Sequence, residues 1–79
     1  MSELKEFLDK LSACDCNLVV LTLISANRVY CRLFKDGQYI DRVFVNDPLI
    51  VTELYKLCGR GEEIDADGIA KLRQKFIAV

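Results

Sequence analysis

The segment "VYCRLFKDGQYIDRVF", Val29–Phe44, places an Asp-Gly pair between two runs in which apolar and polar residues largely alternate. Such alternation is typical of β-strands, and Asp36-Gly37 favours a two-residue type I′ turn, in which both residues adopt positive φ. The segment therefore predicts an antiparallel hairpin. Its simplest register pairs Phe34 with Tyr39, Leu33 with Ile40, Arg32 with Asp41 and Val29 with Phe44.

This register predicts two different faces for the hairpin. One face is expected to pack against helices through Val29, Cys31, Leu33, Ile40 and Phe44, with Arg42 reaching water near an edge. The other face combines aromatic rings with arginines, a composition enriched at protein interfaces. We predict that a partner binds there, through Arg28, Tyr30, Arg32, Phe34, Tyr39 and Asp41, with Val43 beside them. The alternatives are that the third helix, described next, covers these rings, or that the rings simply shield a small sheet.

The flanking segments predict one further strand and three helices. A helix capped by Ser2 precedes a strand within "NLVVLTLIS", and a short turn around Ala26 and Asn27 leads into the hairpin. Asp47-Pro48 is typical of a helix start, with Gly59 after its end, and the last helix starts at Asp65 with the packing stripe Ile69, Leu72 and Phe76. We expect a single α+β domain over residues 1–79: a three-stranded antiparallel β-meander with one N-terminal and two C-terminal helices.

The first strand is apolar on both of its faces. Val19, Leu21 and Leu23 alternate with Leu18, Val20 and Ile24. Such a strand is either covered on both sides or contacts a partner with its second face. A homodimer is one possibility for that contact, and the apolar tail "FIAV", Phe76–Val79, is a candidate contributor.

The overall charge argues against a phosphate-tracking protein. Eleven Lys and Arg residues stand against twelve Asp and Glu residues, and no basic stripe is present, so nucleic acid is an unlikely partner. The charged start "MSELKEFLDKL" does not resemble a signal peptide, and no apolar run is long enough to cross a bilayer. We expect a cytoplasmic protein that does not contact membranes.

The residues suited to catalysis or metal binding are few. The chain has no histidine, and its four cysteines lack the paired spacing of a zinc site. "EEIDADGIA", Glu62–Ala70, departs from a calcium loop because Gln74 stands where a bidentate glutamate is needed, and "GRG", Gly59–Gly61, is too short for a phosphate loop. We therefore expect no metal, no cofactor and no enzymatic activity.

The order helix, three strands, helix is similar to that of the double-stranded-RNA-binding domain. That family begins its second helix with a lysine cluster that grips phosphates. Here the matching positions, Asp47 to Val51, carry an acid and no base. The resemblance is therefore limited to element order and implies no function.

The function most consistent with these features is a small non-catalytic protein–protein interaction module. Stoichiometric inhibitors and adaptors of larger complexes are of this kind, including inhibitors of host defence encoded by phages or other mobile elements. The alternative is a module that binds single-stranded nucleic acid, with bases stacked on Tyr30, Phe34 and Tyr39 beside Arg28 and Arg32.

Overall fold

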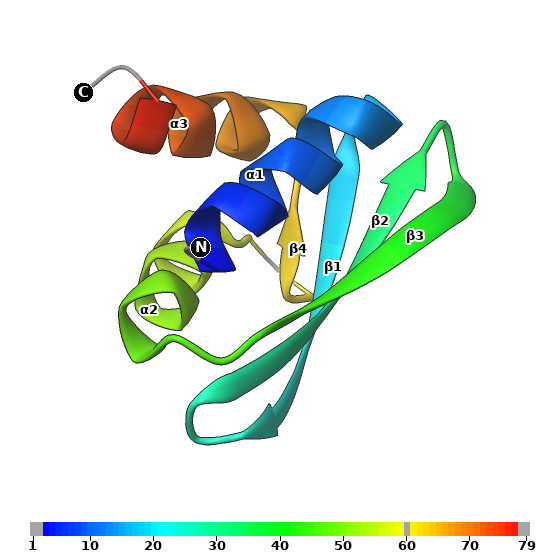
Figure 1. Cartoon of the computed structure of the whole chain (residues 1–79). Coiled ribbons are helices and arrows are strands. Elements are labelled where there is room, and N and C mark those ends of the chain that lie inside the picture. Colours follow the sequence, from blue (N-terminus) through cyan, green and yellow to red (C-terminus); the bar gives the residue numbers. More distant parts are fainter. Residues whose placement is uncertain (1–2, 60, 78–79) are drawn as a thin grey trace.

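The computed structural model describes residues 3–59 and 61–77, and these form the predicted α+β fold (Figure 1). The elements are α1 (Glu3–Cys14), β1 (Leu18–Ser25), β2 (Arg28–Lys35), β3 (Gln38–Val45), α2 (Pro48–Leu57), β4 (Glu63–Ile64) and α3 (Ala66–Ile77). The three long strands form an antiparallel meander, and the sheet order is β3-β2-β1-β4. The Ser2 cap and the packing of Phe76 and of the tail to Val79 lie outside what the structure describes.

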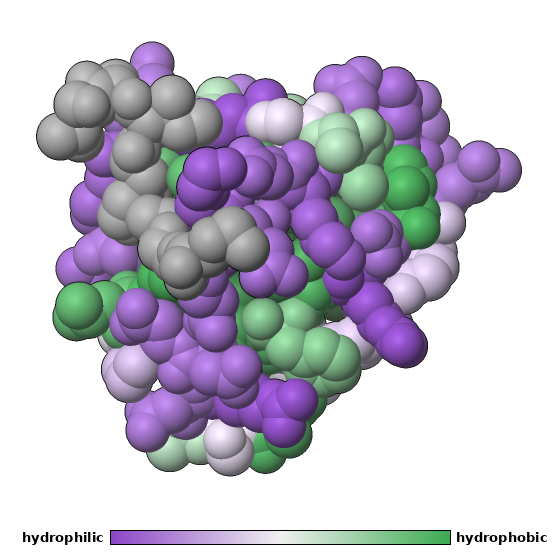
Figure 2. Space-filling model, viewed as in Figure 1, coloured by the Kyte–Doolittle hydropathy of each residue, from purple (hydrophilic) through white to green (hydrophobic). Residues whose placement is uncertain are grey.

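The helices pack on one face of the sheet, and the core lies between the two layers (Figure 1). Most strand residues that point toward the helices are buried, as are the inward side chains of the helices. On the side viewed in Figure 2, hydrophilic side chains predominate, with smaller hydrophobic areas between them. The least exposed core residues, each at most 2% exposed, are Phe7, Leu11, Val19, Leu21, Val29, Cys31, Leu33, Val45, Leu54, Ile64 and Leu72.

The Asp-Gly turn forms as predicted. Asp36 and Gly37 have φ angles of 51° and 82°, and the ladder starts with Lys35 opposite Gln38 and Phe34 opposite Tyr39. The Asn17 side chain holds this turn from the α1–β1 connection, since its Nδ2 donates to Asp36 Oδ1 at 3.0 Å and its Oδ1 accepts from the Asp36 backbone N at 3.2 Å.

Beyond Phe34 and Tyr39, a β-bulge changes the register. Leu33 lies opposite Asp41, so Ile40 is an extra residue on β3. The pairs then run Arg32 with Arg42, Cys31 with Val43, Tyr30 with Phe44 and Val29 with Val45. The predicted pairs of Leu33 with Ile40, Arg32 with Asp41 and Val29 with Phe44 are therefore wrong.

The bulge has a clear physical reason. In a regular strand Arg42 and Phe44 would face the helices, and burying an unpaired guanidinium costs several kcal/mol, on the order of the penalty for any isolated buried charge. The extra residue reverses the alternation, so Val43 and Val45 enter the core while Arg42 and Phe44 face outward. Ile40, which was expected in the core, is 41% exposed.

The short strand β4 was not predicted from the sequence. Glu63 and Ile64 pair with Val20 and Val19 of β1. The backbone N of Leu21 also donates to the Glu62 carbonyl at 2.9 Å. A two-residue strand has no alternation of its own, so only the tertiary pairing with β1 reveals it.

The starts of α2 and α3 agree with the sequence. Asp47 caps α2 by accepting from Leu49 N at 2.9 Å, with Pro48 in the first turn, and Asp65 accepts from Gly68 N at 2.9 Å at the start of α3. The end of α2 differs in detail. Cys58 caps it in an extended conformation, and Gly59 does not adopt a positive φ.

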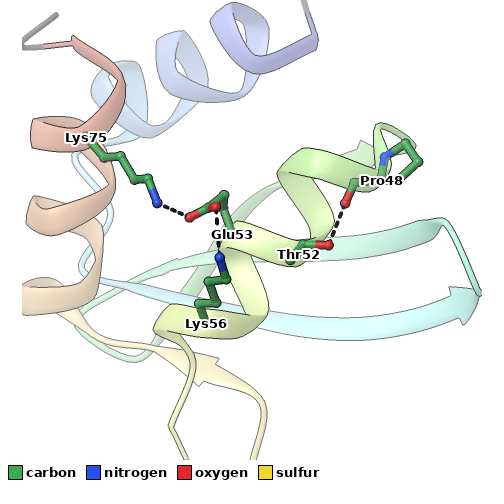
Figure 3. A network of polar contacts seen from close by, with 5 residues as sticks. All are labelled: Pro48, Thr52, Glu53, Lys56 and Lys75. Atoms are coloured by element: carbon green, nitrogen blue, oxygen red, sulfur yellow. Dashed lines mark hydrogen bonds and ion pairs between the residues drawn. The ribbon is translucent and has the colours of Figure 1, made fainter.

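Glu53 joins α2 to α3 (Figure 3). Its carboxylate pairs with Lys75 of α3 and, at 3.3 Å, with Lys56 of its own helix. The hydrogen bond from Lys75 is the largest cause of a lowered pKa for Glu53, followed by a smaller opposing effect of desolvation and then the hydrogen bond from Lys56. Folding therefore favours the ionised form of Glu53.

We predict that Glu53→Gln lowers the melting temperature modestly at neutral pH, because the pairing with Lys75 is lost. Since the pKa of Glu53 is depressed below its ordinary value of 4.5, the contribution is fully present above that value and disappears as the pH falls through the folded pKa. The melting temperatures of the two proteins should therefore converge as the pH falls below 4.5 and through the folded pKa of Glu53. Glu6→Gln, at an exposed glutamate of α1, is the control, and an equal effect of both variants contradicts the assignment.

We predict that deletion of Ile40 preserves the fold. Removing the extra residue of the bulge leaves Tyr39 next to Asp41, so the observed pairs on both sides of the bulge can continue without interruption. The circular dichroism spectrum should be unchanged. Deletion of Arg32 from β2 is the matched control, because it turns one end of β2 to the wrong face and should unfold the domain. Unfolding by the Ile40 deletion would show that the bulge itself is required.

Candidate functional site

The sheet face that points away from the helices carries most of the predicted partner-binding residues. β2 contributes alternate residues, and β3 contributes those opposite them after the bulge has shifted the register. In the described part of the chain, no helix packs on this side of the sheet. We call this surface the aromatic–arginine face, and it consists of Arg28, Tyr30, Arg32, Phe34, Tyr39, Arg42 and Phe44.

Five of the six predicted residues lie together on this face, and Asp41 does not. Asp41 lies opposite Leu33, on the helix side of the sheet. Its Oδ2 pairs with Lys10 Nζ of α1 at 3.3 Å, and its Oδ1 accepts from the Arg42 backbone N at 2.7 Å. These contacts, the Arg42 N–H first, lower the pKa of Asp41. The carboxylate expected to neutralise Arg32 is therefore used between β3 and α1.

Two residues of this face were assigned to the opposite side from sequence. Arg42 and Phe44 point outward, and Val43, expected outward, is buried. The signal was present in the sequence: a regular strand would have turned the Arg42 side chain toward the apolar core, and a bulge is the usual way to avoid that.

The four rings form two cross-strand pairs. The Tyr30 and Phe44 ring centroids are 5.0 Å apart, and Phe34 meets Tyr39 edge-to-face at 5.8 Å. The guanidinium of Arg28 lies 4.8 Å from the centroid of the Phe44 ring. Desolvation, followed by the neighbouring Tyr30 hydroxyl, raises the pKa of Tyr39, so the Tyr39 phenol stays a neutral donor near neutral pH. The rings support one another and remain accessible: Tyr39 is 51% exposed and Phe44 41%.

The two central arginines lie directly opposite each other, between the aromatic pairs. Arg32 of β2 faces Arg42 of β3, and the neighbouring β1 position is Val20. Ion pairs among the described residues all involve lysine, and no arginine of this face takes part in one. The Nε of Arg32 is buried and has no hydrogen-bond partner within residues 3–59 and 61–77.

The free edge of β3 is less suited to binding than the face. Lys10 Nζ donates to the Arg42 carbonyl at 3.3 Å, and Asp41 accepts from the Arg42 N–H. Further along, Glu3 accepts from the backbone N of Asn46 and of Asp47. Backbone groups that would pair with an added strand are thus already bonded at these positions.

The thiols offer little chemistry. All four cysteines are free, and Cys16 and Cys31 are buried. Burial raises the pKa of the Cys31 thiol to about 12 and also raises that of Cys16, so both stay protonated at neutral pH and are poor nucleophiles.

Acidic residues gather in a hollow of about 470 Å³ beside the start of α3, which is lined by Glu63, Asp65, Asp67 and also by Lys56 and Lys71. Asp65 is used there as the helix cap. Among the described residues, no group of three or more Cys, Asp or Glu side chains is placed to hold a metal ion.

Comparisons with protein-family models, with curated proteins and with solved structures found no match for this chain. Within the described residues, no helix has the length and apolar character required to span a membrane. A functional interpretation therefore depends on the chemistry of the aromatic–arginine face.

Proposed function

We propose that this protein is a non-catalytic protein-binding module and that its partner docks on the aromatic–arginine face. The observation that supports this most directly is the uncovered sheet surface, in which two aromatic pairs flank two arginines. Aromatic and arginine side chains dominate the binding energy of many protein interfaces. A small domain of this kind is suited to act as a stoichiometric inhibitor or adaptor of a larger complex.

The cross-strand contacts also favour recognition by a preformed surface. Tyr30 and Phe34 are half-buried against their ring partners, so little side-chain entropy remains to be lost when a partner binds. Leu18 and Val20 of β1 lie on the same side of the sheet, opposite Phe34 and Arg32, and extend the apolar area. The apolar second face of β1 thereby acquires a role in partner contact.

Single-stranded nucleic acid is the second candidate, and one observation favours it: without Asp41, the face has three arginines and four aromatic rings. Base stacking, however, needs a whole ring face that no other side chain occupies, and exposure of a ring edge is not enough. Here Arg28 lies over Phe44, and the other rings contact one another. Three of the eleven basic residues are the arginines of the face, so the rest of the chain has eight basic residues against twelve acidic ones. The net negative charge of that remainder repels a long polyanion.

We predict that Tyr39→Ser combined with Phe44→Ser abolishes partner capture and leaves the fold intact. Both side chains are well exposed, so the melting temperature should fall by only a few degrees, roughly what about 1 kcal/mol produces in a domain of this size. The measurement is quantitative mass spectrometry of proteins retained by each variant from the cell of origin, together with thermal unfolding.

The matched control is Leu23→Ser combined with Leu49→Ser, which removes two exposed apolar side chains, 52% and 77% exposed, outside the aromatic–arginine face. A protein retained by the wild type and by this control, and lost from the Tyr39/Phe44 variant, supports the proposal. Equal capture by all three proteins contradicts it, as does unfolding of the Tyr39/Phe44 variant, which would show that these rings belong to the core.

A further inference from the structure

The opposed pair Arg32–Arg42 is unfavourable in the isolated protein. Residues directly opposite in an antiparallel pair have Cα atoms about 4.5 to 5.5 Å apart, and like charges in such positions destabilise the sheet. The two arginines occupy the middle of the aromatic–arginine face, with the Tyr30–Phe44 pair on one side and the Phe34–Tyr39 pair on the other.

No carboxylate on the described part of this face neutralises the pair. Asp41, the nearest acid along the chain, is turned to the helix side and pairs there with Lys10. Among the causes of the lowered pKa of Asp41, attraction to the Arg42 guanidinium is the smallest. Glu63 lies in the same row across the sheet, but Val20 stands between it and Arg32. Two strand spacings, about 9.6 Å, separate Glu63 from Arg32.

We infer that the partner presents a carboxylate, from an acidic segment of another protein, to the guanidinium groups of Arg32 and Arg42. This inference rests on the proposed function and names the chemistry that it requires. Guanidinium groups bind carboxylates through paired, charge-assisted hydrogen bonds, and the Nε of Arg32 has no hydrogen-bond partner among the residues that the structure describes. The flanking ring pairs would exclude water around the ion pair and so strengthen it.

The same charges argue against a second copy of the chain stacked face to face. Such a dimer would bring two Arg32–Arg42 pairs together with no acid between them, and like charges in contact across an interface cost several kcal/mol. They also argue against a nucleic-acid strand, because two opposed arginines form one compact positive spot and not a track along a backbone.

The first test needs no partner. Arg42→Glu replaces the opposed like charges by an Arg–Glu pair, which should raise the melting temperature by roughly 1 to 8 °C. Lys71→Glu, at an exposed position of α3, makes the same change in net charge and should give no such rise. If Arg42→Glu leaves the melting temperature unchanged or lowers it, the opposed pair is not strained and the inference loses its basis.

The second test uses a random dodecapeptide display library selected on the full chain, followed by amide chemical-shift mapping of the selected peptides. We expect enrichment of Asp and Glu over the input library, shifts centred on Arg32 and Arg42, and at least tenfold weaker binding to Arg42→Glu. Binding to Lys71→Glu should stay within about twofold of the wild type, since this site is remote from the face.

The possible outcomes separate the inference from the proposed function. One outcome is that the selected peptides map to the face and depend on Tyr39 and Phe44, yet lack acidic residues or bind Arg42→Glu as well as the wild type. This outcome contradicts the inference of a carboxylate and still supports the aromatic–arginine face as the binding surface. If no peptide is selected, or if the peptides map elsewhere, both fail. Oligo(dT) that binds this face, with affinity falling steeply as salt rises, replaces the protein partner by nucleic acid. Concentration-dependent dimerisation through the face replaces it by a second copy.

Discussion

The β-bulge at Ile40 is the constraint on which the surface of this protein depends. The sheet is covered by helices on one side, so each residue of β3 belongs either to the core or to the outer face, and a single extra residue reverses that assignment for all those beyond it. The bulge buries Val43 and Val45 and turns Arg42 and Phe44 outward. If β3 kept Ile40 and paired regularly, a guanidinium would face the interior and the outer surface would lack one of its aromatic pairs.

The position of Asp41 follows from the same bulge and has two consequences. On the helix side, its contacts with Lys10 and with the Arg42 N–H tie the edge strand to α1 and occupy backbone groups that an added strand would need. On the outer side, its absence leaves Arg32 and Arg42 without a neutralising acid among the described residues. One local irregularity thus blocks the edge at Arg42 and leaves the neighbouring face with uncompensated positive charge.

A protein with a net charge of −1 can therefore still present a positively charged surface. The lysines described in ion pairs lie away from the aromatic–arginine face, and the arginines of that face form no ion pair with an acid in the part of the chain that the structure describes. An overall balance of charge says little about a small sheet face, because a handful of residues determine its potential at contact distance. The proposed acidic partner depends on this local arrangement.

The sequence by itself determined the element order, the Asp36-Gly37 turn, the caps of α2 and α3 and five of the six predicted face residues. Each of these depends on neighbours within a few positions, through turn chemistry, capping or periodicity. Tertiary structure decided the bulge, the strand β4, the place of Asp41 and the absence of a helix over the aromatic rings in the described structure. Val43 and Val45 compete with Arg42 for places in the core, and Lys10 competes with Arg32 for the Asp41 carboxylate. The strand β4 forms because its two residues pair with β1, which is distant in the sequence. The position of Arg42 within the apolar alternation signals one of these conflicts, but no local pattern in the chain records how any of them is resolved.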